Sequence, residues 1–282
     1  MQSTRVSPSH IDRAIQFRQL HRGPEVLILP NAWDVASARI FEDAGFPAIA
    51  TTSGGIAFSL GYPDGQRIPR EEMLARIARI ARALQVPLTA DVESGYGSTP
   101  EDAARTASEL MQAGVVGMNL EDAGHRPDQP LIDLQLAVEK IRAVREAAMQ
   151  IGSQIVVNAR TDVYLLPGGN ADADYSEALR RLIAFRDAGA DCVFAPGLKD
   201  SETIERLVKA VACPLNILAG VGSPSIPELH KLGVARVSVG SGPMRATLGL
   251  LQRVAQELKT TGTYGAMEGA VAYADVNQLL AG

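Results

Sequence analysis

One pattern recurs four times along the 282-residue chain and limits its possible folds more than any other feature. An amphipathic stretch ends at a glycine, and a short run of mainly apolar residues follows it. The copies are EDAGFPAIATTS, MQAGVVGMNLED, RDAGADCVFAPG and HKLGVARVSVGS. Glycine suits the left-handed residue that ends a helix, and a short apolar run suits a strand that is buried on both faces. Each copy therefore predicts a helix, a C-cap and a parallel strand.

Four further apolar runs lie between these copies and bring the number of predicted strands to eight. They are VLILPNA, VPLTADVE, QIVVNARTD and PLNILAG. Eight parallel strands with intervening helices predict an α/β fold of the TIM type, a (β/α)8 barrel. No linker or composition shift divides the chain, so we predict a single domain over 1–282. Within it, 243–282 would hold the last barrel helix and a C-terminal extension with one more helix.

Two of the connecting segments carry clear helix signals. In the segment 68–85, apolar residues fall three or four positions apart behind Pro69, as an amphipathic helix requires. In the next, Thr99 is a good N-cap, Pro100 a good first residue and Gly114 a good terminator. Both segments therefore predict helices that alternate with the strands.

Composition narrows the possible partners. The formal net charge of -5 and the pI near 5.5 give no electrostatic reason to expect nucleic acid or an anionic membrane. No run approaches the roughly 18 apolar residues of a spanning helix. Two cysteines, Cys192 and Cys213, are too few for a disulfide framework and lack metal-ligand spacing. We therefore expect a soluble cytoplasmic protein with two buried free thiols, in which an anionic substrate needs a local positive centre.

Acidic residues follow two neighbouring predicted strands at the points where those strands end. Asp91 and Glu93 follow the third strand, in TADVESGYG, and Glu121 and Asp122 follow the fourth. The active site of a TIM barrel lies at the carboxyl ends of its strands, where these carboxylates would repel one another unless a cation neutralised them. Such oxygen ligands suit Mg²⁺, with Mn²⁺ as the alternative. Each acid could instead be a simple N-cap or turn former.

Other strand ends supply groups that can bind an anion. Arg160 ends the fifth strand, and its planar fork matches a carboxylate in a bidentate manner. The second strand ends in a turn whose backbone N–H groups can face an anion, made by Ser53, Gly54 and Gly55. Structural roles stay open for Arg160 as part of an ion pair, and for Asn158 and Asn216 as partners of the barrel backbone.

Most of the chain, from LPNAWDVASARIFEDAGF to RVSVGSGPMRA, resembles the isocitrate lyase/phosphoenolpyruvate mutase superfamily. The segment TTSGGIAFSLGYPD is similar to the one that carries a substrate-binding Ser-Gly and a catalytic aspartate in that superfamily. The resemblance implies that Ser53, Gly54 and Gly55 bind substrate and that Asp64 is catalytic.

Three shorter motifs extend the resemblance to the metal and to the substrate carboxylate. DVESGYG is similar to the Asp-x-Asp-x-Gly-Tyr-Gly metal motif, with Asp91 and Glu93 at the acids. NLEDAGH matches the Glu-Asp after strand four, which implies Glu121, and NARTD matches the strand-five arginine, Arg160. The superfamily makes or breaks C–C or C–P bonds next to a 2-oxo or 2-hydroxy acid through an enolate bound to Mg²⁺. Its last helix swaps between subunits, which implies a homo-oligomer, a dimer or a tetramer.

The chain also departs from the best-known members. The loop after strand four, AGHRPDQ, has neither the cysteine of isocitrate and methylisocitrate lyases nor the lysine and asparagine of the C–P mutases. Pro196 stands where those lyases have a glutamate after strand six, and Glu93 replaces an aspartate. The sequence therefore resembles the less characterised carboxyvinyl-carboxyphosphonate phosphorylmutase-like branch.

Together these observations predict a Mg²⁺-dependent lyase that cleaves a C–C bond of a small 2-oxo or 2-hydroxy dicarboxylate by decarboxylation or retro-aldol cleavage. Asp91 is the first choice of metal ligand, with Glu93 and Glu121 beside it. The substrate carboxylates would be held by the 53–55 turn, Arg160 and Asn216. His125 is the loop's only side chain with a pKa near neutrality, so it is a candidate acid. Two rivals remain: a C–P bond enzyme of the phosphonopyruvate or phosphoenolpyruvate type, and a non-catalytic dicarboxylate-binding protein.

Overall fold

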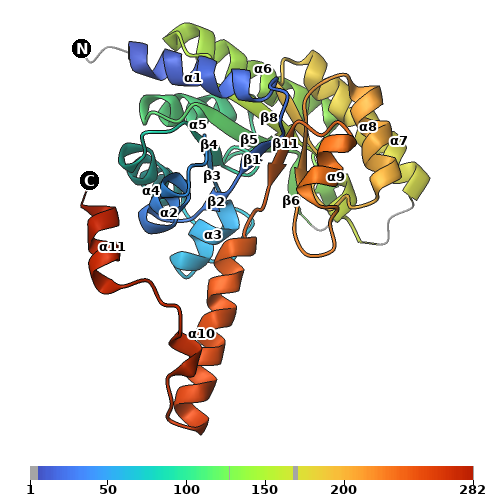
Figure 1. Cartoon of the computed structure of the whole chain (residues 1–282). Helices are drawn as coiled ribbons and strands as arrows, with labels where there is room; N and C mark the ends of the chain where they lie inside the picture. Colours follow the sequence, from blue (N-terminus) through green and yellow to red (C-terminus); the bar gives the residue numbers. More distant parts are fainter. Residues whose placement is uncertain (1–5, 127, 168–170, 282) are drawn as a thin grey trace.

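The computed structural model describes residues 6–126, 128–167 and 171–281. Its centre is a parallel sheet with the strand order β1-β11-β10-β9-β8-β5-β4-β3-β2 (Figure 1). The strands are β1 (Leu27–Leu29), β2 (Asn31–Ala32), β3 (Ile49–Thr51), β4 (Leu88–Asp91), β5 (Gly117–Glu121), β8 (Val156–Arg160), β9 (Cys192–Phe194), β10 (Leu215–Leu218) and β11 (Arg236–Ser238).

The ring closes through a first strand that is divided in two. β1 and β2 are separated only by Pro30, which has no N–H to give to a strand ladder. β1 pairs with β11 on one side, and β2 pairs with β3 on the other. These two halves count as one strand of the ring, so the described sheet forms a nearly closed eight-stranded barrel. The predicted TIM barrel is confirmed.

Helices follow the strands in the expected alternation. They are α1 (Pro8–Leu20), α2 (Val35–Asp43), α3 (Ser53–Ser59), α4 (Arg70–Ala83), α5 (Pro100–Gln112), α6 (Leu134–Ile151), α7 (Ala171–Asp187), α8 (Ser201–Val211), α9 (Ile226–Lys231), α10 (Gly242–Thr260) and α11 (Tyr273–Leu280), with 3-10 turns η1 (Val163–Leu165) and η2 (Gly265–Met267). Thr99 caps α5 by accepting from the Asp102 N–H at 3.2 Å. The four repeated glycines all have a left-handed backbone: Gly45, Gly114, Gly189 and Gly233. The predicted helix and C-cap signals are therefore confirmed.

The amino end of the barrel is closed by α1, which crosses it ahead of the first strand (Figure 1). Phe17 of α1 is fully buried and packs in a small apolar cluster with Leu27, Leu29 and Val156. Any Cβ at position 117 would come within 2.6 Å of the Phe17 ring, so β5 needs glycine there. These apolar side chains fill the amino end of the barrel, so its open end is the opposite one, at the carboxyl ends of the strands.

The segment after the fourth barrel strand departs from the predicted loop. It forms an antiparallel hairpin of β6 (Ala123–Arg126) and β7 (Gln129–Leu131). Gly124 is required in it, because a Cβ at that position would collide with the carbonyl oxygen of Gln129. Strand four is therefore followed by an ordered flap of two strands at the open end of the barrel.

The C-terminal part of the chain leaves the barrel. Helix α10 projects from the body, and the chain returns through η2 to α11, which packs near α2 (Figure 1). Met244 is the one buried residue of α10. Large apolar side chains of this arm are exposed, including Leu251, Leu258, Tyr264 and Tyr273. The predicted exchange of this helix between subunits stays a prediction. No described helix is both long and apolar enough to cross a bilayer.

Candidate active site

A cavity of about 150 Å³ opens at the carboxyl ends of the strands. Drug-sized ligands need roughly 300–1,000 Å³, so this cavity fits only a small molecule. Its polar lining includes Ser53, Gly54, Asp64, Asp91, Asn119 and Arg160. Its apolar side chains are Leu165, Phe194, Pro196 and Leu218. Five of the residues predicted from sequence, at positions 53, 54, 64, 91 and 160, therefore border one space.

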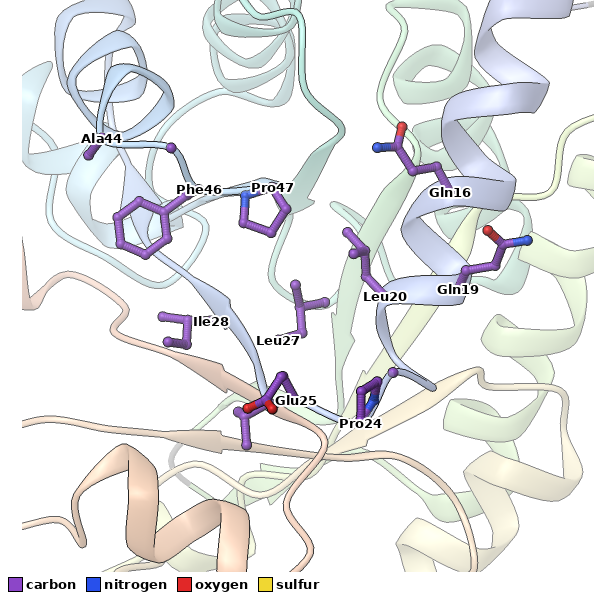
Figure 2. Close-up of a pocket in the computed structure, with 13 residues that line it drawn as sticks. Gln16, Gln19, Leu20, Pro24, Glu25, Leu27, Ile28, Ala44, Phe46 and Pro47 are labelled. Carbon is purple, nitrogen blue, oxygen red and sulfur yellow. The ribbon is translucent and has the colours of Figure 1, made fainter.

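A larger cavity, of about 470 Å³, lies at the amino end of the barrel. Figure 2 shows Leu20 and Gln16 of α1 facing Leu27 and Phe46 across it. Glu25 is the one charged side chain among the described residues that line it. This cavity has no cluster of titratable groups, so the chemistry of the molecule lies at the other end.

Asp91 is held firmly through one of its two carboxylate oxygens. Oδ2 accepts hydrogen bonds from the Ser53 backbone N–H at 3.1 Å and from the Ser53 hydroxyl at 2.9 Å. The Asp91 N–H donates to the Thr51 hydroxyl at 2.9 Å. Its other oxygen, Oδ1, is buried and has no hydrogen-bond partner among the described residues. Asp91 thus presents one fixed, unpaired oxygen to the site.

Glu93 is the second buried carboxylate with an unpaired oxygen, Oε1. Its backbone is left-handed, with φ of 52°, and Tyr96 three residues later has φ of 57°. Such conformations cost about 1–3 kcal/mol each in residues other than glycine and are concentrated at functional sites. Burial, reinforced by Asp64 and Asp91, raises the pKa of Glu93 to about 8. The protein therefore holds an acid where its negative charge is unfavourable without a cation.

These observations fit a divalent cation between Asp91 and Glu93. Both oxygens are buried and without a protein partner, and the neighbouring negative charges disfavour one another. In the described part of the chain, no three His, Cys, Asp or Glu side chains are arranged to hold a metal ion. Mg²⁺ does not need three, because it is commonly bound by one or two carboxylates and keeps several waters. The donor set therefore suits Mg²⁺ better than a metal that requires a full protein cage.

Glu121, the third predicted ligand, has a different environment. Its Oε2 accepts from Arg160 Nη1 at 2.8 Å, and the side chain is buried. Burial raises the pKa of Glu121 well above its ordinary value although Arg160 opposes the shift. Its carboxylate is thus engaged with an arginine, in contrast to those of Asp91 and Glu93.

Arg160 is shared between two acids. Its Nη1 binds Glu121, while Nε and Nη2 form a bidentate pair with Asp162, at 2.8 Å for Nη2. Burial disfavours the charge, but Glu121 and Asp162 outweigh it and raise the pKa of Arg160 above its ordinary value. Three of its five N–H donors are used in these contacts, so two remain for a ligand.

The turn at 53–55 is tied to the same acids. Thr52 caps α3 by accepting from the Gly55 N–H at 3.2 Å. A Cβ on Gly54 would lie 2.9 Å from Asp64 Oδ2, so any larger residue there would displace the carboxylate of Asp64, which packs against this glycine. Burial and the charge of Asp91 raise the pKa of Asp64. Asp64 is thus a carboxyl group inside the cavity that retains a proton to a higher pH than usual.

Five of the ten predicted site residues are not among the described residues that border this cavity: Gly55, Glu93, Glu121, His125 and Asn216. Asn216 is fully buried and exchanges hydrogen bonds with Ser238, at 3.2 Å for Asn216 Nδ2, and it does not border the space. The predicted contact between Asn216 and substrate stays a prediction. His125 lies in β6, but its side chain falls outside the part of the structure that is described, so its role as an acid stays a prediction.

Sequence reasoning missed two contributors. Asp162 is the bidentate partner of Arg160, and Asn119 forms part of the cavity wall. Asn119 stands two residues before Glu121 in GMNLE. Side chains alternate along a strand, so an inward-facing Glu121 places Asn119 on the inward face too. The period of two in β5 was the signal that could have found it.

Comparison with known proteins adds the family to this geometry. The family model for phosphoenolpyruvate phosphomutase matches residues 17–259. The chain belongs to this family. The predicted superfamily is thereby confirmed, and its members are lyases and mutases.

Three similar proteins illustrate the range of this phosphoenolpyruvate phosphomutase family. An uncharacterized protein of Mycobacterium tuberculosis H37Rv is 37% identical over 94% of this chain and 91% of its own length. Oxaloacetate decarboxylase 2 of Pseudomonas fluorescens Pf0-1 is 30% identical over 83% of this chain and 79% of its own. The crystal structure of 2,3-dimethylmalate lyase aligns with a TM-score of 0.83 at 28% identity, over 95% of this chain and 94% of that one.

Proposed function

We propose that this protein is a Mg²⁺-dependent lyase that cleaves a C–C bond of a small 2-oxo or 2-hydroxy dicarboxylate, by decarboxylation or retro-aldol cleavage. The observation that carries the proposal is the cavity of about 150 Å³ bordered by Asp91, which has an unpaired oxygen, and by Asp64 and Arg160. The names of two relatives, an oxaloacetate decarboxylase and a 2,3-dimethylmalate lyase, support a four-carbon diacid skeleton.

Asp91 and Glu93 would hold the metal, Mg²⁺ or Mn²⁺, through their unpaired oxygens. Glu121 would contribute through water, because its carboxylate is already bound to Arg160. When bound, the ion would supply positive charge that stabilises the negative charge developing on the substrate during cleavage. Binding would also relieve the repulsion that raises the pKa of Glu93.

The remaining groups would bind the substrate and carry its proton. The two free N–H donors of Arg160 and the Gly54 N–H of the 53–55 turn would orient a carboxylate in the cavity, since the Ser53 and Gly55 N–H groups already donate to Asp91 and Thr52. Asp64, with its raised pKa, would transfer a proton at the reacting carbon. His125 is the alternative proton carrier, supplied by the flanking hairpin. The apolar residues that border the cavity would accept an alkyl substituent of the substrate and exclude water; they are Leu165, Phe194, Pro196 and Leu218.

The alternative of a C–P bond enzyme is less well supported. A transferring phosphoryl group requires several cationic or amide donors around its oxygens. Arg160 is the one cationic side chain among the described residues that line the cavity, and two carboxylates already share it. Cleavage of a C–C bond makes a smaller demand, and it therefore remains our first choice.

We further propose that the protein is a homo-oligomer, a dimer or a tetramer, held by the C-terminal arm. Helix α10 exposes Leu248, Leu251 and Leu258, which are apolar side chains that a partner surface would cover. Sedimentation velocity tests this directly, and a monomer at micromolar concentration would contradict it.

The function is tested with a panel of 2-oxo, 2-hydroxy and phosphonate acids in the presence of Mg²⁺. Release of pyruvate, glyoxylate and phosphate is measured for each acid. We expect turnover of oxaloacetate or a substituted malate and little or none of phosphonopyruvate. If phosphate is released from phosphonopyruvate faster than any dicarboxylate is cleaved, the protein is better described as a C–P bond enzyme. Binding of diacids without turnover of any acid would favour the non-catalytic reading.

A further inference from the structure

A buried cation lies inside the barrel beside the cavity wall. The side chain of Arg236, from β11, is 1% exposed. Its described contacts are all with uncharged groups: Nη1 lies 3.4 Å from His21 Nε2, and Nη2 donates to Asn119 Oδ1 at 3.3 Å. Its guanidinium carbon is also 6.0 Å from the centre of the Phe17 ring. Burial lowers the pKa of Arg236 to about 10 although the charge of Asp91 opposes the shift, and no described acid contacts the guanidinium directly. Burial of an ion without a directly bound partner of opposite charge costs several kcal/mol, so this arginine calls for an explanation.

His21 does not compensate the charge of Arg236. Its Nδ1 lies 2.8 Å from the carbonyl oxygen of Phe17, which can only accept, so Nδ1 carries the proton. Nε2 then has a lone pair and accepts from Arg236. Burial and the charge of Arg236 lower the pKa of His21 to about 3. The histidine is therefore neutral and holds the guanidinium in place without neutralising it.

Asn119 connects this cation to the cavity. Its Oδ1 accepts from Arg236 Nη2 and from Asn158 Nδ2, the latter at 2.8 Å. A guanidinium has donors only, so the oxygen of the amide must face Arg236 and its NH₂ must point the other way. Asn119 borders the cavity, is 7% exposed, and its NH₂ donates to no described residue. Donation by Arg236 also polarises the amide and strengthens that free donor.

The charges around the cavity show which ligand group this donor fits. Arg160 serves Glu121 and Asp162, so its charge is more than balanced before any substrate enters. A metal ion would balance Asp91 and Glu93. A second carboxylate on the substrate therefore needs a further cation, and Arg236 is the cation that the described cavity wall contacts through Asn119.

We propose that Asn119 binds the second carboxylate of a diacid substrate through its NH₂ group, and that Arg236 orients Asn119 and balances that carboxylate's charge. The inference rests on the proposed function and names the part of the site that selects diacids over monoacids. Asn119 would be a substrate-binding residue and Arg236 a positioning residue.

The test compares two ligands that differ only in that carboxylate. Racemic malate and racemic 2-hydroxybutyrate share a 2-hydroxy acid head, but the second has a methyl group where malate has its distal carboxylate. Binding to the full chain is measured by titration calorimetry at saturating Mg²⁺. We expect the wild type to prefer malate by at least about tenfold, since a hydrogen bond to a charged group contributes about 1.5–3 kcal/mol.

Substitutions then locate the source of the preference. Asn119→Ala should weaken malate binding about tenfold or more and leave 2-hydroxybutyrate within about twofold. Asn119→Asp should weaken malate still further, yet maintain or raise the thermal unfolding midpoint, because it gives Arg236 an acidic partner. Arg236→Lys should lower the preference for malate over 2-hydroxybutyrate only partly, because it keeps the positive charge. Asn277→Ala, at an asparagine of α11 whose Nδ2 donates to the Tyr273 carbonyl oxygen, is the control and should keep the preference. Mg²⁺ affinity without ligand is measured for every variant.

The results separate this inference from the proposed function. A wild type without preference for malate, or Asn119 variants that keep the full preference, would overturn the inference whatever the turnover. If the preference for malate depends on Asn119 but no acid in the panel is cleaved, the inference is supported and the proposed lyase function is contradicted. If Arg236→Lys does not fold, the two Asn119 variants still decide the outcome.

Discussion

The two ends of the barrel treat charge in opposite ways. At the amino end, Asp191 accepts from both Arg18 and Arg145 and also from the Val157 N–H at 2.9 Å. At the carboxyl end, one arginine, Arg160, serves two acids, and three further carboxylates lie close by. At the amino end, the acid and the arginines therefore pair with one another and need no ligand. The acids at the carboxyl end either retain a proton or require an added cation, which supports the metal ion proposed above.

The sharpest way to break this comparison is to make the same change at both ends, and the carboxyl end should respond most in activity. Asp91→Asn removes a ligand oxygen's charge and relieves repulsion at once. We expect Mg²⁺ affinity and activity to fall by roughly 10²–10³-fold or more, with unfolding stability kept or raised. Titration calorimetry and chemical unfolding measure the two effects. Unchanged Mg²⁺ affinity would remove Asp91 from the metal site.

Asp191→Asn, at the amino end, should give the opposite result. It leaves Arg18 and Arg145 without their acid, so we expect unfolding stability to fall by about 3 kcal/mol. The activity of the folded protein should stay within about twofold, because this position is remote from the cavity. Urea unfolding and steady-state kinetics provide the measurements. A large loss of activity in a folded variant would show that the two ends are not independent.

The sequence predicts those features of the two ends that depend on residues close together in the chain, and it does not predict those that depend on contacts between distant segments. The strands and their preceding helix caps, such as Gly45 and Gly114, were predicted because local periodicity and backbone conformation determine them. The convergence of Asp91 and Arg160 followed from the topology of a barrel, whereas Asp64 was predicted through the family resemblance alone. The engagement of Arg160 by Asp162 was not predictable, because it depends on side-chain directions across strands.

Asn119 differs from Asp162, because the period of two in β5 places it on the same face as Glu121 and could have predicted it. That Asn119 reaches the cavity depends on the stagger of the ring, which the sequence does not show. The hairpin that begins at Gly124 also depends on a contact between segments, because its backbone must approach Gln129 closely.

A smaller effect sharpens the comparison at the carboxyl end. Arg160→Lys keeps the charge but loses the bidentate contact with Asp162 and the donors directed at the substrate. We expect kcat/KM to fall by roughly tenfold or more, about 1.4 kcal/mol, at saturating Mg²⁺. Wild-type efficiency on a dicarboxylate would mean that Arg160 serves the structure alone.

A further effect concerns the amino end and its response to acid. Burial lowers the pKa of His10 to about 4 and that of His21 to about 3. The unfolded chain takes up these protons near its pKa of 6.5, before the folded protein does, so stability should fall as pH drops below about 6.5. Each histidine contributes at most about 1.4 kcal/mol per pH unit down to its folded pKa. Chemical unfolding at pH 7, 6 and 5 measures the slope, and His10→Asn should reduce it. A slope that His10→Asn leaves unchanged would contradict the assignment.

The start of helix α10 joins the cavity to the exposed arm. Gly240 and Ser241 border the cavity, and α10 begins at the next residue. A Cβ on Gly55 would lie 3.6 Å from Met244 in the first turn of that helix. A partner that covers Leu251 would fix the axis of α10 and hence the backbone beside the substrate turn. Linkage is reciprocal, so a substrate that orders this turn should tighten the contact between subunits by the same free energy that assembly adds to its own binding.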